Sequence, residues 1–397
     1  MSSPDRKLDI YIFSPYCLLR PTTNRIFDMR LCDAFAGHEQ RVSIVYPYTY
    51  MKDNIRKQDI PAYYGLENHV YTRMLATPLR ENSSKWIRFV LMIIGFSFST
   101  IRQGVGNLFN KRQLVFISRD AKSILPALLI RKMLGSLCSW KVFFMAAEVK
   151  NSRIYKYVVR ESDGILAGVT TTREAIRAIV SVDEENFLLS LAPVPVYRNE
   201  PDKIEARSKI NYELSEPLIV YTGKLGLEVQ EVQYLLEAAH QLPEYMFLFT
   251  GGRKSVVDSI KSYCNDRQID NIILTGFFED SRKIRDYQIS ADVLVSYYTP
   301  KDHMVEFNYP QKINEYMSTG NPVVTPDFPA TRDVLNDRNV LFVKADDVGS
   351  LIAGIKKLVE DKALASRLAA QAILDVQELT FNKRAGEFID FIQRRLK

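Results

Sequence analysis

Short apolar runs alternate with longer amphipathic stretches along the whole chain. In the first half, the runs are rich in β-branched and aromatic residues and are bounded by polar ones, which is typical of buried strands. They predict strands at residues 8–14, 42–46, 114–118, 142–146 and 164–169. Stretches with helical spacing separate these runs, and strands that alternate with helices indicate a mostly parallel sheet. We therefore expect an α/β fold.

A second series of strands and helices begins at residue 218, after a polar segment at 199–216 that lacks sustained apolar periodicity. Such a segment predicts a linker between two lobes. The last stretch, 382–397, alternates apolar and charged residues at helical spacing, which indicates a C-terminal helix. The pattern thus divides the chain into two lobes of similar size.

One apolar run carries no charged residue over positions 89–101, and Lys85, Arg88 and Arg102 bracket it. The run is too short to cross a bilayer, which takes about 20 residues. Two interpretations stay open. The run is a buried helix of the first lobe, or it is a helix in the plane of a membrane surface, with Trp86 at the depth of the lipid headgroups.

Composition adds a few limits to this picture. A chain of 397 residues with 46% hydrophobic and 25% charged residues is typical of a soluble globular protein of two or three domains. The four cysteines are far apart and the histidines are not clustered, so neither a disulfide framework nor a zinc site is indicated. A polar start that leads straight into a strand predicts no signal peptide, and we expect a cytoplasmic protein. The net charge of +6 is mild, and without basic motifs interleaved with aromatic residues we expect no nucleic-acid partner.

The segment 308–326 carries the most specific chemistry. Pro310 suits the first turn of a helix, and Gly320 followed by Pro322 ends that helix before a strand. Glu315 lies in this short helix, where its carboxylate can accept both hydroxyls of a ribose while the positive end of the helix faces a diphosphate. The segment therefore predicts a site for a nucleotide-sugar.

Five ordered motifs between about 218 and 364 resemble the C-terminal domain of retaining glycosyltransferases of the family 4 type, which are group 1 glycosyl transferases with the GT-B fold. The motifs are Tyr221-Thr222-Gly223-Lys224-Leu225, Phe249-Thr250-Gly251-Gly252, Thr275-Gly276-Phe277, Pro310-x-Lys312-x-x-Glu315-Tyr316-Met317 with Gly320-Asn321-Pro322-Val323-Val324, and Asn339 to Asp347. The resemblance implies two Rossmann-like lobes facing a cleft, with a C-terminal helix that crosses back to the first lobe. The expected boundaries are an acceptor-side lobe at 1–198, a linker at 199–216, a donor-binding lobe at 217–380 and the crossing helix at 381–397.

The resemblance also implies a reaction: a sugar moves from a UDP-sugar or GDP-sugar to an acceptor hydroxyl with retention at the anomeric carbon. Departure of the diphosphate builds negative charge, which the protein must stabilise. Because the sequence has no Asp-x-Asp pair to hold a divalent ion, we expect side-chain cations and a helix dipole in place of a metal or other cofactor. The acceptor is a carbohydrate or a lipid-linked molecule, so a membrane surface is a further candidate partner.

The donor-side candidates follow the motifs. Lys224 matches the first diphosphate cation of the family, usually an arginine, whereas the second cation is missing at Val229 or Gln230. Lys312, Arg253 or Lys254 could supply the lost charge. The turn residues Gly223, Gly251 and Gly252 complete the phosphate side, and the backbone of Gly276 and Phe277 matches the base-binding loop, although an aromatic residue there could also fill core.

Two further regions depart from the family. Its first carboxylate falls on Phe307 here, which leaves Glu306 as a candidate for sugar hydroxyls and catalysis and Asn308 as a donor-side hydrogen bonder. In the first lobe, Glu148 and Lys150 resemble the Glu-x-His strand end, with lysine in place of histidine.

The loop after the first strand lacks the glycine-rich turn of many relatives. Contact with acceptor or phosphate would therefore fall to four side chains, Arg20, Thr22, Thr23 and Asn24. Thr23 or Asn24 can also cap a helix at 25–36, because a short polar side chain satisfies free N–H groups of the first turn.

Two other functions remain open from the sequence. A nucleotide-sugar epimerase of the same architecture would use the same donor cleft but needs paired carboxylates for proton transfer, and no such pair stands out. A catalytically weak, glycosyltransferase-like binding protein would explain the missing cation and the displaced carboxylate.

Overall fold

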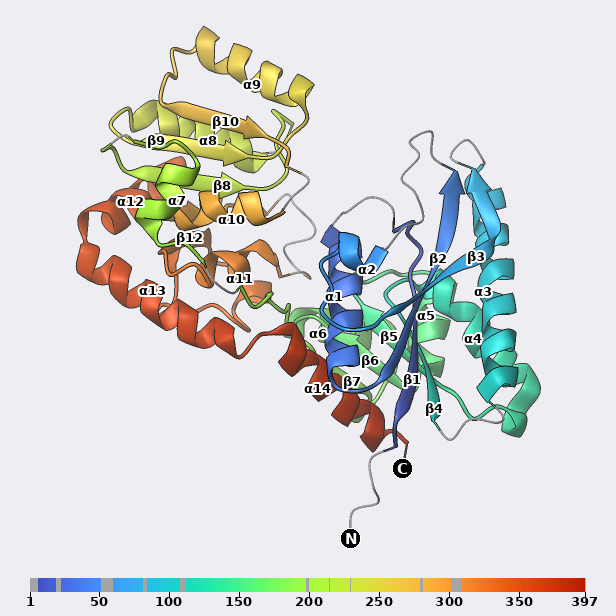
Figure 1. Ribbon diagram of the computed structural model, residues 1–397. Coiled ribbons are helices and arrows are strands. Elements are labelled where there is room, and N and C mark those ends of the chain that lie inside the picture. The colour runs from blue at the N-terminus through green and yellow to red at the C-terminus, as the bar shows by residue number, and fades with distance from the viewer. Residues whose placement is uncertain are drawn as a thin grey trace. The chain divides into compact units, whose positions relative to one another are not determined.

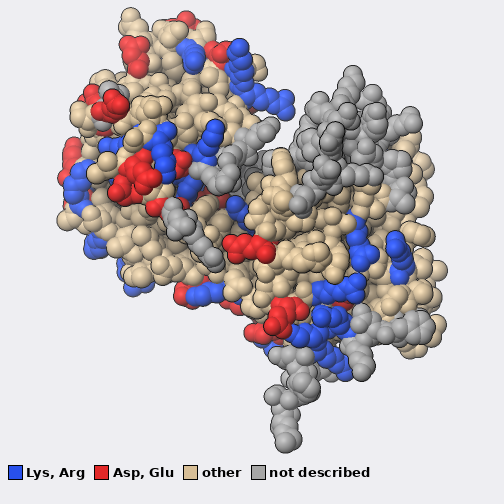
Figure 2. All heavy atoms as spheres, in the orientation of Figure 1, with Lys and Arg blue, Asp and Glu red and all other residues tan. Residues whose placement is uncertain are grey.

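The computed structural model describes residues 6–18, 23–50, 60–80, 84–107, 112–197, 200–213, 215–228, 230–278, 281–300, 307 and 309–396. The chain forms two compact units. The first comprises Met1–Leu191 together with Phe381–Lys397, and the second comprises Ala192–Thr380. Figure 1 shows the elements of each unit, and Figure 2 shows acidic and basic side chains spread over the visible surface of both.

The first unit is built on a seven-stranded parallel sheet with the order β3-β2-β1-β4-β5-β6-β7 (Figure 1). Its strands are β1 Leu8–Phe13, β2 Arg41–Tyr50, β3 Tyr71–Arg80, β4 Gln113–Ser118, β5 Lys141–Ala146, β6 Gly164–Ala167 and β7 Phe187–Leu189. The five strands predicted from apolar runs are confirmed. The two edge strands were not predicted, because β3 carries two arginines and a proline and β7 is only three residues long.

Helices cover both faces of this sheet (Figure 1). They are α1 Thr23–Gly37, α2 Ile60–Tyr63, α3 Lys85–Asn107, α4 Ala121–Leu134, α5 Arg153–Glu161, α6 Thr170–Ile179 and α14 Phe381–Arg394, with short 3-10 turns at Gly135–Leu137 and Glu184–Asn186. One hydrophobic cluster lies under α1 and α14, and another lies under α3, α4 and α5. The sheet is therefore buried on both faces, as parallel sheets usually are.

The C-terminal helix α14 is part of the first unit although it follows the whole second unit in sequence. Its Phe388 and Phe391 rings each lie 5.8 Å from the Phe143 ring of β5. A Cβ atom at Gly164 on β6 would come within 2.5 Å of the Phe391 ring, so this position leaves room for the helix because it has no side chain. The last helix is thus packed into the core of the first unit.

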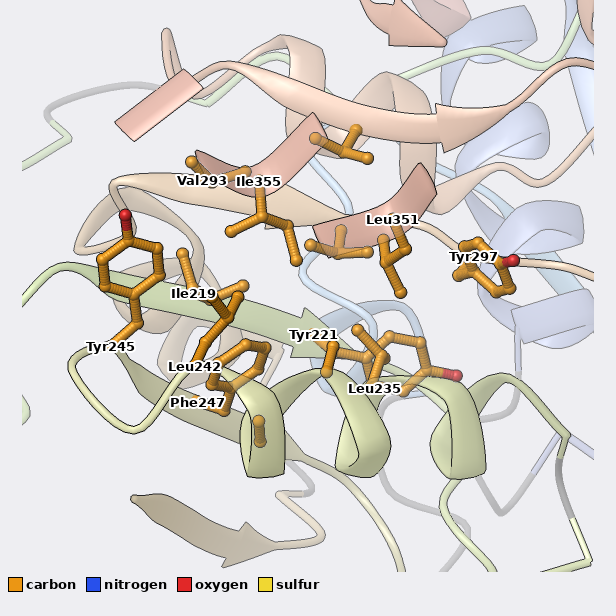
Figure 3. Packing of buried hydrophobic residues seen from close by; sticks show 14 of the residues in the cluster. Ile219, Tyr221, Leu235, Leu242, Tyr245, Phe247, Val293, Tyr297, Leu351 and Ile355 are labelled. Atoms are coloured by element: carbon orange, nitrogen blue, oxygen red, sulfur yellow. The ribbon is translucent and has the colours of Figure 1, made fainter. Parts of the chain in front are cut away.

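The second unit is a six-stranded parallel sheet with the order β10-β9-β8-β11-β12-β13. Its strands are β8 Leu218–Thr222, β9 Met246–Thr250, β10 Ile272–Gly276, β11 Val293–Val295, β12 Val323–Pro326 and β13 Leu341–Val343. Its helices are α7 Lys203–Lys209, α8 Gln230–Gln241, α9 Lys254–Asp266, α10 Ser281–Ile289, α11 Lys312–Met317, α12 Val348–Glu360 and α13 Lys362–Gln377, with a 3-10 turn at Pro329–Thr331. Figure 3 shows Ile219 and Phe247 of the sheet packing against α8 and α12. Two α/β units with parallel sheets confirm the predicted fold class.

The polar segment 199–216 differs from the predicted linker, because it is folded into the second unit and forms α7. Arg207 of α7 donates to Asp292 at 2.6 Å, and Lys203 lies 3.5 Å from the same carboxylate. Burial alone would raise the pKa of Asp292, but the Leu218 N–H, Lys203 and Arg207 together hold it below its usual value. Lys203 and Arg207, whose charges suggested a solvated linker, therefore form ion pairs within the second unit.

Candidate functional site

The turns after β8, β9 and β10 lie side by side at the carboxyl edge of the second sheet. Gly223 N donates to Thr250 O at 3.0 Å, and Gly251 N donates to Gly276 O at 2.9 Å. The strand order reverses direction at β8, which lies between β9 and β11. In open parallel sheets, ligands bind outside the carboxyl ends of the strands at such a reversal.

Glycine is required where these turns approach one another. Gly251 has φ +133°, and a Cβ atom there would lie 2.0 Å from the Gly223 carbonyl oxygen. Gly252 has φ +75° and Gly276 has φ +79°, both in the region that other residues rarely adopt. The absence of side chains lets the three turns pack closely and leaves main-chain groups at the rim, as the sequence motifs predict.

The helix α11 contains Lys312 and Glu315 and starts two residues later than the sequence suggested. Pro310 lies in the turn before the helix, where its carbonyl accepts from Ile313 N at 3.0 Å. The helix ends at Met317, and Gly320, at φ +76°, lies in the turn that follows. Asn321 then anchors the chain, because its Nδ2 donates to the carbonyls of Gln288 and Ile289 at 3.0 and 2.9 Å.

A buried tyrosine ties α11 to the end of β8. The Tyr316 hydroxyl accepts from Thr222 N at 2.8 Å and lies 3.1 Å from Thr222 Oγ1. Its side chain is completely buried, and this burial raises the pKa of Tyr316 well above its ordinary value. Since Thr222 directly precedes Gly223, the hydrogen bonds fix α11 relative to the turn after β8.

Arg285 holds the other end of α11. This side chain from α10 donates from Nη1 to Glu315 O at 2.7 Å and from Nη2 to Ser318 O at 3.0 Å. Its Nη2 also donates to Glu200 Oε2 at 2.8 Å, and the guanidinium is 4% exposed. Carbonyls at the end of a helix lack partners within the helix, so Arg285 satisfies them while fixing the backbone of Glu315.

Lys312 lies between two aromatic rings. Its ammonium is 4.2 Å from the centre of the Tyr221 ring and 4.7 Å from that of Tyr298, a cation–π arrangement. Burial lowers the pKa of Lys312 to about 8, and Glu231 opposes that shift. Within the part of the chain that the structure describes, no carboxylate forms an ion pair with this ammonium. The hydroxyl of Tyr221 donates to Lys224 O at 3.2 Å, so Lys312 lies beside the turn that carries Lys224.

The remaining donor-side candidates lie at the surface. Lys224 and Arg253 are exposed, and Glu315 is half-buried. The Phe277 ring is 63% exposed, so it does not fill core. Glu306 and Asn308 lie outside the described residues.

The first-unit candidates form a separate group. Glu148 and Lys150 are exposed after β5 and form an ion pair of 2.7 Å, and the hydrogen bond to Glu148 raises the pKa of Lys150. Asn24 is exposed in the first turn of α1, which begins at Thr23. Arg20 and Thr22 lie outside the described residues, as does the side chain of Thr23.

A buried charged pair that no sequence motif indicated lies at the same edge of the first sheet. Asp28 is 2% exposed, accepts from Ser14 Oγ at 3.0 Å and lies 3.7 Å from an Arg119 nitrogen. Burial raises the pKa of Asp28, against the effect of Arg119. Ser14 and Arg119 each directly follow a strand, β1 and β4, which is the signal that could have revealed a polar cluster at the carboxyl edge of the first sheet.

Comparison with known proteins gives one family match. Residues 216–361 match the family model described as Glycosyl transferases group 1. We call these matched residues the group 1 segment. They include β8 to β13 and α11, so the match covers every donor-side residue described above. No curated protein matches the chain in sequence.

Solved structures match the whole chain at low sequence identity. Sucrose-phosphate synthase (tll1590) from Thermosynechococcus elongatus aligns with a TM-score of 0.74 at 14% identity, covering 98% of this chain and 99% of that one. A glycosyltransferase from Rickettsia africae ESF-5 aligns with a TM-score of 0.74 at 12% identity, with the same coverage of 98% and 99%. Anabaena Alr3699/HepE in complex with UDP and glucose aligns with a TM-score of 0.70 at 11% identity over 96% and 99%. The predicted resemblance to GT-B glycosyl transferases of group 1 is confirmed.

The described residues of the site contain no cluster of side chains that could bind a metal ion. No group of three or more histidine, cysteine, aspartate or glutamate side chains is placed to hold an ion there. Lys224, Lys312 and Arg253 are cationic side chains of the second unit that can meet an anionic ligand at this edge.

Proposed function

We propose that this chain is a retaining glycosyltransferase that moves a sugar from a nucleoside-diphosphate-sugar to an acceptor hydroxyl without a metal ion. The observation that carries the proposal is the position of α11. Its Glu315 and Lys312 lie within the group 1 segment and are fixed by Tyr316 and Arg285 beside the three glycine turns. The similarity to HepE, which was solved with UDP and with UDP-glucose, supports this class of donor.

Glu315 binds the ribose of the donor in this proposal. A carboxylate accepts both ribose hydroxyls in many nucleotide sites. Arg285 donates to the Glu315 carbonyl, which fixes the backbone from which the half-buried Glu315 side chain extends. The exposed Phe277 ring and the backbone of Gly276 then contact the base, either uracil or guanine.

Lys224 and Lys312 stabilise the departing diphosphate. Lys312 replaces the cation that the sequence lacks at 229 or 230, because its ammonium lies next to the turn that carries Lys224. A nearby dianionic diphosphate raises the pKa of this lysine and keeps it charged. Losing one fixed donor to a developing charge typically costs about 3 kcal/mol of barrier. Arg253, at the start of α9, is a further cation on the same edge.

The acceptor side belongs to the first unit. Glu148 and Lys150 follow β5, and Asn24 lies in the first turn of α1, so the three lie at the carboxyl ends of that unit's strands. We assign them, with Arg20, Thr22 and Thr23, to the acceptor or its phosphate. Glu306 and Asn308 complete the assignment on the sugar side, in a cytoplasmic enzyme of glycan or glycolipid synthesis.

The test uses donor binding and turnover together. The purified chain is incubated with UDP-sugars and GDP-sugars in the presence of EDTA. Mass spectrometry identifies transfer products, and proton NMR identifies epimerised donor and the anomeric configuration of the transferred sugar. Sugar transfer to an added acceptor or to water supports the proposal. An epimerised donor without transfer supports an epimerase and contradicts it, as does nucleotide binding without any turnover.

Glu315→Ala tests the ribose assignment. We expect this variant to lose donor binding, measured by titration calorimetry, while its circular dichroism spectrum stays unchanged. Glu237→Ala is the matched control, because Glu237 is an exposed glutamate on α8 of the same unit. Unchanged donor affinity in the Glu315 variant removes this carboxylate from the site.

A further inference from the structure

The outer face of α3 is apolar and exposed. This helix of 23 residues is long and apolar enough to cross a membrane, yet only 22% of its most apolar stretch is buried. Five of its exposed side chains recur three, four or seven residues apart, which places them on one stripe. They are Ile87, Ile94, Phe98, Ile101 and Val105. Trp86, at 72% exposure, lies at the N-terminal end of the stripe.

The opposite face of α3 belongs to the core. The Phe96 ring stacks on Phe13 of β1 with 4.7 Å between ring centres. Met92 Sδ accepts from Ser123 Oγ of α4 at 3.8 Å, and a Cβ atom at Gly104 would come within 2.6 Å of the Trp140 ring. A bilayer-spanning position would break these contacts. The helix is therefore neither fully buried nor free to leave the fold.

The neighbouring helix α4 extends the exposed apolar surface. Leu129 and Met133 on α4 and Leu137 just after it are exposed, and Met133 reaches 83%. The two helices pack side by side along the sheet (Figure 1). We call this surface the α3–α4 face. A group of exposed apolar side chains on two neighbouring helices marks an interaction site more often than single exposed side chains do.

The charges of the two helices are all of one sign. Six basic residues, Lys85, Arg88, Arg102, Lys122, Arg131 and Lys132, lie on α3 and α4, and the sequences of these helices contain no aspartate or glutamate. Arg131 forms an ion pair with Asp163, so the other five basic residues carry the charge of this face. The whole chain is nearly balanced, with 53 basic and 47 acidic residues. The partner that fits this face is therefore both apolar and anionic.

We propose that the α3–α4 face docks on a membrane surface that contains anionic lipids. The apolar stripe enters the boundary between headgroups and acyl chains, Trp86 lies at headgroup depth, and Lys85, Arg88 and Arg102 of α3 meet lipid phosphates. A second copy of the chain fits poorly, because a two-fold interface would place this face against itself and bring like charges together.

The location of α3 connects this surface to the acceptor side. The helix begins soon after β3 ends, at the carboxyl edge of the first sheet, where Glu148 and Lys150 also lie. If the proposed glycosyl transfer is correct, a docked α3–α4 face brings that edge close to the lipid, which suits a lipid-linked acceptor. The docking itself does not depend on catalysis, so a binding assay tests it separately.

The test is co-sedimentation of the full chain with phosphatidylcholine vesicles that contain or lack phosphatidylglycerol. We expect binding to the anionic vesicles at low salt, and much weaker binding at high salt or without the anionic lipid. The Ile94→Asp/Phe98→Asp double variant should lose at least tenfold in partition coefficient. Leu374→Asp is the matched control, because Leu374 is equally exposed on α13 of the second unit, and it should bind like the wild type.

Intrinsic fluorescence gives a second readout. The chain has two tryptophans, and Trp140 is already buried, so a blue shift on adding vesicles reports Trp86 entering an apolar environment. Trp86→Phe should remove the shift. Arg88→Gln/Arg102→Gln should weaken binding by about fivefold for each residue, the usual contribution of a basic residue near an anionic surface.

Three outcomes overturn the proposal. The first is failure to sediment with anionic vesicles at low salt. The second is equal binding by the Ile94→Asp/Phe98→Asp and Leu374→Asp variants when circular dichroism shows both to be folded. The third is a dimer in light scattering that Phe98→Asp dissociates, which would make the face a contact between copies.

Discussion

The carboxyl edges of the two sheets differ in how their polar groups are held. In the second unit, α11 is fixed by the buried Tyr316 and Arg285, and the adjoining turns meet through glycines. In the first unit, Asp28 is buried beside Ser14 and Arg119, but the candidate residues Glu148 and Lys150 are exposed and pair with each other. The contrast indicates that the candidate residues of the second sheet are held in place for a ligand. Those of the first sheet can exchange their ion pair for a ligand without disturbing the fold. Substitutions on the two edges should therefore separate binding from stability in different ways.

Gly251→Ala should have the largest effect. The new Cβ would lie 2.0 Å from the Gly223 carbonyl, in a backbone conformation with φ +133° that alanine rarely adopts. Because the clash is with main chain, no side-chain rotation relieves it, and we expect a loss of about 3 kcal/mol in the free energy of unfolding. Urea denaturation measures this loss, and donor binding should disappear with it.

Gly106→Ala is the matched control in the first unit. No atom lies within 4 Å of the added Cβ, and the position is helical, so this variant should be unchanged or slightly more stable. Equal stability of the two variants would show that the close approach of the turns is not a constraint on the second edge.

Tyr316→Phe should have the next largest effect. Removing the hydroxyl leaves the buried Thr222 N–H without its acceptor, which typically costs about 1 to 3 kcal/mol. Since Thr222 precedes the turn that carries Lys224, donor affinity should fall as well. Tyr234→Phe provides the control, because that hydroxyl bonds to Asp346 at the surface. A Tyr316 variant as stable as this control would mean that α11 is held by other contacts.

Tyr316 and Arg285, the two side chains that hold α11, show which contacts the sequence does not predict. The glycine turns were predicted because their contiguous motifs resemble those of the family, and α11 was predicted because Pro310 and Gly320 delimit a short helix. Tyr316 and Thr222 are 94 residues apart in the sequence, and Arg285 and Glu200 are 85 residues apart. No local sequence spacing therefore predicts either hydrogen bond.

The same limit explains the segment 199–216 and the helix α3. The charges of 199–216 suggested a linker, because their partner Asp292 lies far along the chain. The apolar composition of α3 left a buried helix and a surface helix both open, since composition does not tell which face a neighbouring sheet covers. The parallel sheets, in contrast, followed directly from the alternation of strands and helices.

Lys312→Met should change how stability depends on pH. The pKa of Lys312 is about 8 in the folded chain and 10.5 as its ordinary value, so both states carry the proton below pH 8. Between these values the unfolded chain binds more protons, and stability therefore rises with pH. The variant should be more stable than the wild type at pH 7, and the difference should shrink as the pH rises from 8 toward 10.5. Urea denaturation of both proteins across this range measures it.

Proton uptake during donor binding is a second test of the lowered pKa of Lys312. A diphosphate near Lys312 raises the pKa of its ammonium, so nucleotide binding above pH 8 should take up a proton. Calorimetry in two buffers of different ionisation enthalpy detects this uptake, and Lys312→Met should abolish it. Proton uptake that persists in the variant would assign it to another group.

Glu148→Gln should have the smallest effect on stability and still matter for turnover. An exposed ion pair contributes at most about 1 kcal/mol, so the free energy of unfolding should barely change. If the first edge meets the acceptor, the variant should keep its nucleotide affinity and lose activity toward the acceptor, seen as a change in kcat or acceptor KM at saturating donor. If the variant instead loses nucleotide affinity and keeps its kinetics toward the acceptor, Glu148 contributes to donor binding. The assignment of the acceptor to the carboxyl edge of the first sheet would then be wrong.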